Sequence, residues 1–93
     1  MFEWNEQKAA RNAREHKGVT FGEAETVFDD PYVYLEDDVE HSYQEDRFVA
    51  LGVSEKLRIL FVCFTYRGEN IRLISARKAT PRERKHYDRN KTD

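Results

Sequence analysis

Several features of common protein classes are missing from this sequence of 93 residues. It holds one cysteine, Cys63, so no disulfide can form within the chain and no second thiol is present for a cysteine-based zinc site. No apolar run approaches the roughly 20 residues that a membrane-spanning helix needs. The first residues, Met1 to Asn5, lack the basic and then apolar pattern of a signal peptide. We therefore expect a cytoplasmic protein.

Positive charge is also missing from one long stretch of the chain. Residues 18–46 contain ten acidic residues and no lysine or arginine, whereas residues 47–93 contain 12 basic residues and 5 acidic ones. The net charge of −2 hides this division, so a low overall pI does not exclude a cationic face that binds nucleic acid.

The length and the apolar content indicate one compact domain. Hydrophobic residues make up 39% of the chain and charged residues 37%, which is enough apolar surface to avoid the disordered class but not to build two cores. We expect a single globular domain over residues 1–93, with a frayed basic tail from about residue 89.

Three segments have the capping and apolar patterns of helices. The first follows Asn5, a candidate N-cap, and stops near Gly18. The second begins at residues 20–23, Thr-Phe-Gly-Glu, whose spacing is that of a capping box, and it ends before Pro31. The third begins at residues 80–83, Thr-Pro-Arg-Glu, which combine an N-cap, a proline at the first helical position and a glutamate at the third.

The segment between the second and third helices predicts a small sheet. Residues 48–53, 57–66 and 71–76 are rich in β-branched and aromatic side chains, and short polar breaks between them favour antiparallel hairpins. The middle segment is apolar on both alternating faces and is expected at the centre. Residues 32–35 predict a short further strand and residues 36–46 a loop. The expected fold class is α+β, a small antiparallel sheet of three to four strands flanked by two N-terminal helices and one C-terminal helix.

The first candidates for chemistry are the cations on and after the predicted strands. Guanidinium groups bind phosphate oxygens bidentately and stabilise charge that builds at a phosphorus centre. Strict alternation places Arg72 on one face of its strand and Arg77 on the other, so the cations need not converge. Ordinary solvation of an exposed surface is the alternative for each. The set comprises Arg58, Arg67, Arg72, Arg77, Lys78, Arg82, Arg84, Lys85 and Arg89.

Histidines and acidic residues are the other candidates. His16, His41 and His86 suit proton transfer near neutral pH, but their spacing matches no metal motif, and a plain surface histidine is the alternative for each. The acidic residues between positions 36 and 40 lie in a predicted loop, a poor platform for the rigid carboxylates of a two-metal site. We expect no metal and no other cofactor, and we expect Cys63 to be a core residue.

Several strings of residues resemble the BrnT family of toxins, from Phe2 to about Tyr87. The most specific strings are Ile74-Ser75-Ala76-Arg77-Lys78-Ala79 and His16-Lys17-Gly18-Val19-Thr20-Phe21. Shorter ones are Phe2-x-Trp4-Asn5 and Glu45-x-Arg47-Phe48-x-Ala50-Leu51-Gly52.

This resemblance implies a RelE-like fold and a metal-independent ribonuclease toxin of a type II toxin–antitoxin system, which arrests growth by cutting RNA. It also implies a cognate antitoxin of the BrnA type, a ribbon-helix-helix protein that neutralises the toxin. Operator DNA would be contacted only through the antitoxin, and no membrane is involved. From the charge pattern, basic segments of the antitoxin would approach residues 36–46, or acidic ones would cover the arginines. The second is the more economical, because one contact would both bind and inhibit the toxin.

Metal-free RNA cleavage sets the roles that the candidate residues would fill. The neighbouring 2′-hydroxyl is the nucleophile, so the enzyme supplies a base, an acid and cations for the phosphorane. On this hypothesis the catalytic residues are His16, Glu45, Arg67, Arg77 and Lys78, and the RNA-binding residues are Arg47, Tyr66, Arg72 and Arg82. The alternatives are a non-catalytic module that binds nucleic acid or a partner, and an inhibitor that acts through protein contacts alone.

Overall fold

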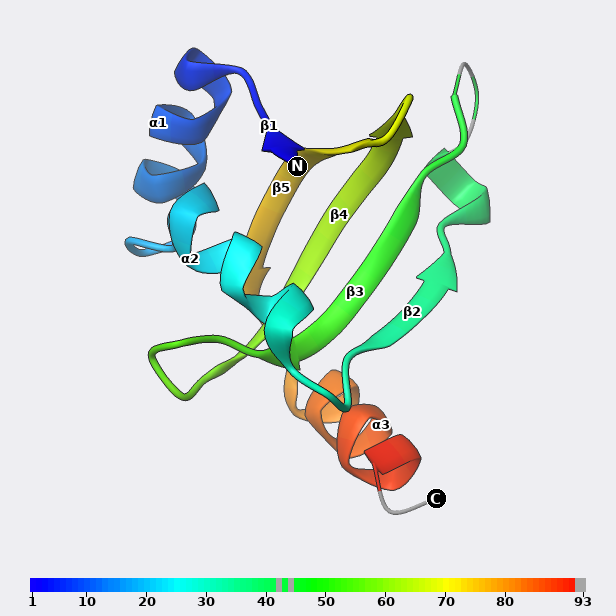
Figure 1. Ribbon diagram of the computed structural model, residues 1–93. Coiled ribbons are helices and arrows are strands. Elements are labelled where there is room, and N and C mark those ends of the chain that lie inside the picture. The colour runs from blue at the N-terminus through cyan, green and yellow to red at the C-terminus, as the bar shows by residue number, and fades with distance from the viewer. Residues whose placement is uncertain (42, 44, 92–93) are drawn as a thin grey trace.

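The computed structural model describes residues 1–41, 43 and 45–91 (Figure 1). Within these residues the chain forms a five-stranded sheet with the order β1-β5-β4-β3-β2. β1 pairs with β5 in parallel, and the other neighbouring strands are antiparallel. The strands are β1 (Phe2–Glu3), β2 (Tyr34–Asp37), β3 (Phe48–Val53), β4 (Ile59–Arg67) and β5 (Asn70–Lys78).

The α+β class, the two hairpins and the central place of β4 are confirmed, but the predicted strand count and the wholly antiparallel sheet are wrong. The extra strand, β1, has two residues, too few to show an alternating pattern, and it forms because the Ile71 amide donates to the Met1 carbonyl (2.8 Å). β2 lies two residues later than expected, so residues 36–37 pair with β3 instead of forming a loop.

The helices begin where the sequence predicts. They are α1 (Glu6–Glu15), α2 (Phe21–Thr26) and α3 (Pro81–Lys91), with 3-10 turns η1 (Val27–Asp29) and η2 (Val39–His41). The capping box of α3 is complete, since Thr80 and Glu83 each accept the other's backbone amide. No described helix is long and apolar enough to cross a membrane. Fraying from about residue 89 stays a prediction, because α3 continues to Lys91 and residues 92–93 lie outside the described residues.

The capping box expected at α2 forms only in part. Thr20 Oγ1 accepts the Glu23 amide (3.0 Å), as predicted. The Glu23 carboxylate, however, binds Arg58 (2.6 and 2.8 Å) and the Ser54 hydroxyl (2.6 Å) on the β3–β4 hairpin. Its hydrogen bonds with Arg58 outweigh burial and lower the pKa of Glu23, so this carboxylate fixes α2 to the hairpin instead of closing the cap.

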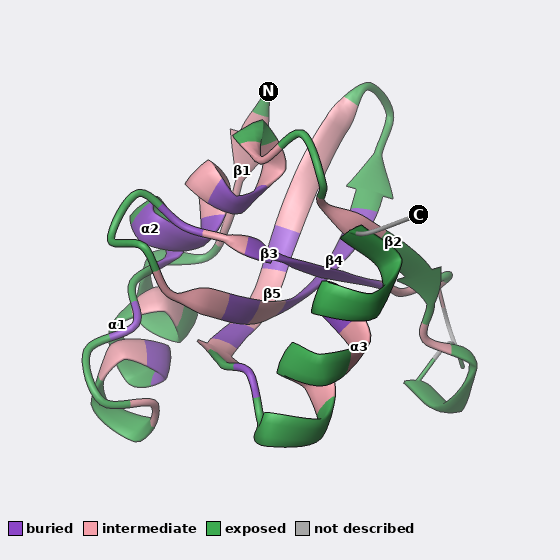
Figure 2. Ribbon diagram, turned by 90° about the horizontal axis from the view of Figure 1, so that it is seen from below, coloured by how far each residue is buried: buried purple, intermediate pink, exposed green. Residues whose placement is uncertain are grey.

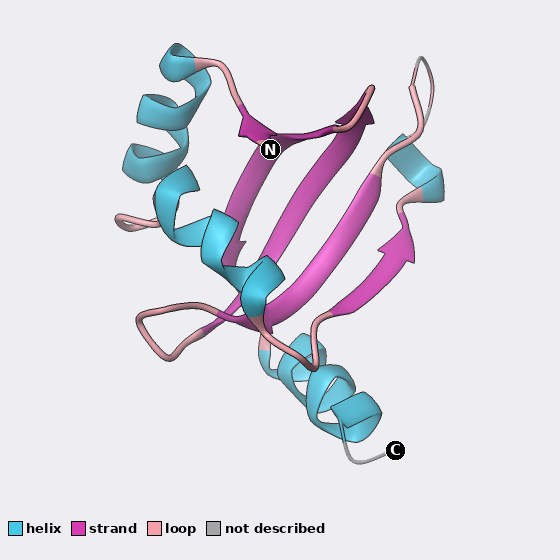
Figure 3. Ribbon diagram, in the orientation of Figure 1, coloured by secondary structure: helices cyan, strands magenta, loops and turns pink. Residues whose placement is uncertain are grey.

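Each face of the sheet packs against different helices (Figures 1 and 3). On the first, here called the α2 face, side chains of the central strands pack against Phe21, Ala24 and Val27. On the second, the α3 face, Leu51 packs with Tyr87 of α3. Figure 2 shows the buried stretches of β3 and β4 between the two helical layers. The α2-face side chains from the sheet are Ala50, Leu60, Val62, Phe64, Leu73 and Ala76.

A bulge in β5 decides which side chains reach the α3 face. Ser75 pairs with Cys63, but Leu73 pairs with Phe64, so Ile74 is an extra residue on β5. Leu73 and Ala76 consequently share the core of the α2 face, which alternation alone forbids. The prediction that Arg72 and Arg77 lie on opposite faces is therefore wrong, because the bulge turns both toward the α3 face.

Candidate active site

Arg47 lies where two pockets on the α3 face meet. One pocket, about 310 Å³ and here called the His16 pocket, is formed mainly by α1 and β5. The other, about 410 Å³ and here called the Glu45 pocket, is lined by His41, Tyr43 and Glu45. Arg47 lines both, so it shares one pocket with His16 and the other with Glu45. The other residues of the His16 pocket are Lys8, Arg11, Asn12, Glu15, Ile74 and Ser75.

The end of α1 places His16 against the edge of β5. The His16 backbone amide donates to the Asn12 carbonyl (2.9 Å), which makes His16 the C-cap. The Asn12 side chain bonds both backbone groups of Ala76 and the carbonyl of Val19. This helix end is thereby fixed to the sheet, and His16 is positioned by backbone hydrogen bonds rather than by a flexible loop.

Hydrogen bonds also hold the segment that carries Glu45 and Arg47. The Asp38 amide donates to the Arg47 carbonyl (2.8 Å), and the Thr65 hydroxyl donates to the Asp46 carbonyl (2.5 Å). These bonds extend the β2–β3 and β3–β4 pairings beyond the strand ends. Glu45 also forms an ion pair with Arg67 at the end of β4 (3.3 Å), so two of the predicted catalytic residues meet directly.

Cys63 is a buried thiol near Glu45 and Arg47, and its reactivity is low. Burial raises its thiol pKa to about 11, and the charge of Asp38 adds to the shift, while the Arg47 cation opposes it. The thiol is therefore neutral near pH 7 and is a poor nucleophile. Its place in the buried core agrees with the sequence.

The remaining predicted catalytic residues lie apart from this junction. Arg77 forms a bidentate ion pair with Glu83 of α3 (2.8 and 3.0 Å), and its guanidinium lies 4.1 Å from the centre of the Phe61 ring. Burial would raise the pKa of Glu83, but the hydrogen bonds from Arg77 and the Thr80 amide outweigh it, and the pKa is lowered. Lys78 pairs with Leu60 and so faces the other side of the sheet.

The predicted RNA-binding residues are also divided. Arg72 reaches the α3 face but contacts Glu3 of β1 (3.5 Å). Tyr66 lies on the α2 face, where its ring packs near those of Phe48 and Phe64 (centroids 5.2 and 5.6 Å apart). Arg82 lines a different groove on α3. Arg47 is the member of this set that joins the predicted proton-transfer residues.

The contribution of α1 was not predicted from the sequence. Lys8, Arg11 and Glu15 line the His16 pocket, and with Asn12 and His16 they recur at spacings of three and four. That spacing puts them on one face of a helix, so the pattern was present in the sequence. Among the described residues, no group of three or more histidine, cysteine, aspartate or glutamate side chains is arranged to hold a metal ion.

Comparison with known proteins adds an independent observation. The family model described as "Ribonuclease toxin, BrnT, of type II toxin-antitoxin system" matches residues 4–83. The chain belongs to the BrnT family. Its structure is similar to the crystal structure of the Brucella abortus ribonuclease toxin BrnT, with a TM-score of 0.65 and 27% identity over 86% of this chain and 97% of that one. A comparison with curated proteins found no match.

The BrnT match confirms the resemblance seen in the sequence and covers the pocket junction. His16, Glu45 and Arg47 all lie inside the matched residues, as does Arg67. The match stops at Glu83, in the first turn of α3, so most of α3 lies beyond it. The BrnT family is one of ribonuclease toxins of type II toxin–antitoxin systems.

Proposed function

We propose that this BrnT toxin is an endoribonuclease that cleaves RNA without a metal ion, at the junction of the His16 and Glu45 pockets. The observation that carries the proposal is that Arg47 lines both pockets. A cation is thereby placed between two groups that can move protons, which is the set that metal-free cleavage needs.

Each group has one role in the proposed reaction. Glu45 accepts the proton of the 2′-hydroxyl, whose oxygen then bonds to the adjacent phosphorus. His16 donates a proton to the 5′-oxygen as the bond from phosphorus to that oxygen breaks. Arg47 binds the equatorial oxygens of the phosphorane, where its planar fork matches two oxygens at once. The products are a 2′,3′-cyclic phosphate and a 5′-hydroxyl.

Neighbouring residues support these roles. Arg67 holds Glu45 through their ion pair and orients the carboxylate. Lys8 and Arg11 add positive charge to the His16 pocket, where they attract the RNA backbone. The catalytic roles predicted for Arg77 and Lys78 stay predictions, since Arg77 is engaged by Glu83 and Lys78 faces the other side of the sheet.

RNA cleavage in excess EDTA tests the proposal. We expect cyclic phosphate ends, and we expect His16→Ala and Glu45→Gln each to lower kcat by about 10²–10⁴-fold. Arg47→Ala should cost about 10²–10³-fold. The matched controls are Glu55→Gln and Lys56→Ala, exposed residues on the β3–β4 hairpin at the other end of β3, which should retain activity. Binding without cleavage would instead support a non-catalytic module, and cleavage that requires Mg²⁺ would contradict the metal-free reaction.

An antitoxin is the partner that a type II toxin family implies, and one edge of the sheet has the composition of its docking surface. Tyr32, Leu35, Val39 and Tyr43 are 49–88% exposed and lie along or beside β2, the edge strand. Acidic residues of the same segment, at positions 36–38 and 40, lie between Leu35 and Tyr43. An edge strand with exposed apolar side chains and negative charge suits an extended basic segment of a partner.

We propose that a basic segment of a BrnA-type ribbon-helix-helix antitoxin docks on this edge and that DNA binding belongs to the antitoxin. Tyr43 lines the Glu45 pocket, so one contact both binds the toxin and covers its base. Val39→Lys with Tyr43→Lys should weaken the complex and restore toxicity on co-expression. Leu57→Lys, a control at an exposed apolar residue of the β3–β4 hairpin, should not. A complex that survives the double substitution contradicts this docking surface.

A further inference from the structure

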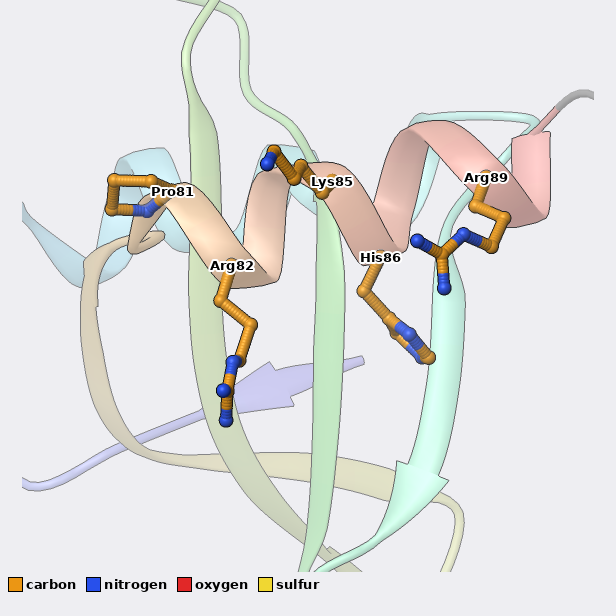
Figure 4. Close-up of a pocket in the computed structure, with 5 residues that line it drawn as sticks. All are labelled: Pro81, Arg82, Lys85, His86 and Arg89. Carbon is orange, nitrogen blue, oxygen red and sulfur yellow. The ribbon is translucent and has the colours of Figure 1, made fainter.

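One side of α3 forms a groove whose ionisable side chains are all basic. The groove has a volume of about 490 Å³ and is lined by Pro81, Arg82, Lys85, His86 and Arg89. Positions 82, 86 and 89 recur at helical spacing, and Figure 4 shows their side chains extending to the same side of the helix. Such a stripe concentrates positive charge on a single surface.

The acidic residues of α3, Glu83 and Asp88, are not among the residues that line this groove. Glu83 is held by Arg77 and by the Thr80 amide on the sheet side of the helix. Asp88 is exposed and is not among the residues that line the groove. Among the described residues, the side chains that line the groove are basic apart from Pro81.

The stripe is carried by a fixed helix. Tyr87 is 2% exposed and its hydroxyl donates to Asp30 Oδ2 (2.5 Å), which ties the middle of α3 to the segment between η1 and β2. The His86 ring packs edge-on against Tyr34 of β2, with centroids 4.7 Å apart. A site built on a packed helix keeps its geometry better than one on a loop.

The groove lies on the same face of the sheet as the pocket junction. α3 covers one end of the α3 face, and Arg47 precedes β3 at the other. In Figure 4 the side chains of Arg82, His86 and Arg89 extend in the direction in which β2 runs, toward the end of the sheet where β3 begins. A strand of RNA that crosses the junction can continue toward α3 on the same face.

We propose that the α3 groove binds the phosphate backbone of the RNA substrate a few nucleotides from the scissile bond. The inference rests on the proposed function and adds to it a second contact on the substrate. Arg82 and Arg89 are two helical turns apart, about 10 Å along the helix axis, so they can contact different phosphates of one strand. Backbone contacts of this kind give affinity and direction without reading the bases.

RNA fits this groove better than an acidic protein segment does. Protein interfaces have an apolar or aromatic centre, and none of the exposed large hydrophobic side chains of the described residues lies on α3. Guanidinium groups and an imidazole held against a tyrosine ring suit phosphate oxygens instead. The two proposed partners are thus assigned to different residues, RNA to the α3 groove and the antitoxin to the β2 edge.

Salt-dependent binding of an RNA of about 12 nucleotides with 2′-O-methyl groups tests the groove, because this RNA cannot be cut by 2′-hydroxyl attack. The Arg82→Gln, Arg89→Gln double variant should bind at least tenfold more weakly at low salt. Its slope of log affinity against log salt should fall by about 1.4, that is, 0.7 for each lost contact. The matched control is Arg14→Gln with Lys56→Gln, which removes two exposed cations elsewhere and should change neither value.

Turnover supplies a second readout. The double variant should raise KM for a 12-nucleotide RNA, leave kcat unchanged and cleave a dinucleotide as the wild type does. The proposal would be overturned if the double variant kept the wild-type salt slope and KM. It would also be overturned if the double variant lost the antitoxin complex but still bound RNA as the wild type does. If the wild type leaves RNA uncut but the double variant still has a smaller salt slope, the groove contact is supported and the proposed catalysis is contradicted. If the wild type cleaves RNA but the double variant keeps the wild-type salt slope, the proposed groove contact is wrong and the proposed catalysis is unaffected.

Discussion

The side chain of Asn12 pairs with the backbone of Ala76 as a neighbouring strand would. Its Nδ2 donates to the Ala76 carbonyl (2.8 Å), and its Oδ1 accepts the Ala76 amide (3.0 Å). β1 covers β5 only at residues 71–72, so these bonds satisfy the exposed edge farther along. The same Nδ2 donates to the Val19 carbonyl (3.0 Å), and α1, β5 and the start of α2 thus meet at one buried amide.

We expect Asn12→Asp to destabilise the fold by roughly 2–5 kcal/mol, because a carboxylate cannot donate and would face two carbonyl oxygens in a buried site. Urea unfolding at pH 7 measures the change. Asn90→Asp, an exposed position on α3, should shift the free energy of unfolding by about 0.5 kcal/mol or less. Equal stability of the two variants would show that the Asn12 bonds contribute little.

The Asp30–Tyr87 bond predicts a loss of stability in acid. Burial raises the pKa of Asp30, but hydrogen bonds from Tyr87, Val53 and Tyr32 outweigh it, and the pKa lies below its ordinary value of 3.8. A carboxyl with a lowered pKa stabilises the fold above pH 3.8, and this contribution disappears as the pH falls through the folded value.

Asp30→Asn should therefore unfold more easily at pH 7 and lose less further stability between pH 5 and pH 3 than the wild type. Glu23 and Glu83 also have lowered pKa values, so part of the acid dependence remains. Urea unfolding at a series of pH values measures both effects. If the free energy of unfolding of the variant fell as steeply as that of the wild type between pH 5 and pH 3, Asp30 would not contribute to the acid dependence.

Arg77 and Glu83 should behave as a structural pair. We expect Arg77→Ala to lower the free energy of unfolding by about 1–3 kcal/mol, because it removes two charge-assisted hydrogen bonds that join β5 to α3. Arg77→Lys should not restore the loss, since an ammonium group cannot form the bidentate contact.

The ribonuclease activity of folded Arg77→Ala distinguishes a structural role of Arg77 from the catalytic role predicted from the sequence. We expect a loss of less than tenfold, because the guanidinium is held by Glu83 and lies apart from the pocket junction. A loss of tenfold or more in fully folded protein would place the cation at the transition state, as the sequence predicts.

Cys63 should be dispensable for catalysis. With a thiol pKa of about 11, the thiolate fraction at pH 8 is about one in a thousand. Cys63→Ala should retain RNA cleavage within a few-fold, and iodoacetamide should label the native protein far more slowly than the urea-unfolded one. Rapid labelling of native protein coupled to loss of activity would contradict the neutral, buried thiol.

Local hydrogen bonding explains which parts of the fold the sequence predicts well. The helix starts at Asn5, Thr20 and Thr80 each depend on a side chain and an amide three residues apart, so the pattern is complete within a short window. The β3–β4 and β4–β5 hairpins likewise follow from apolar runs with short polar breaks. The missing half of the Thr20 box shows the limit, because Glu23 found stronger partners more than thirty residues away.

The sequence by itself determined the helix starts, the central strands, the family resemblance and the identity of His16, Glu45 and Arg47 as candidates. Only the tertiary structure decided which of the candidates meet. The bulge at Ile74 arises from the pairing of two strands and reverses the alternation that separates Arg72 from Arg77. Arg47 and His16 line one pocket because Asn12 fixes α1 to β5, a contact across 64 residues that no local pattern records. Local bonds can be read from neighbouring residues, whereas the site depends on packing between distant segments.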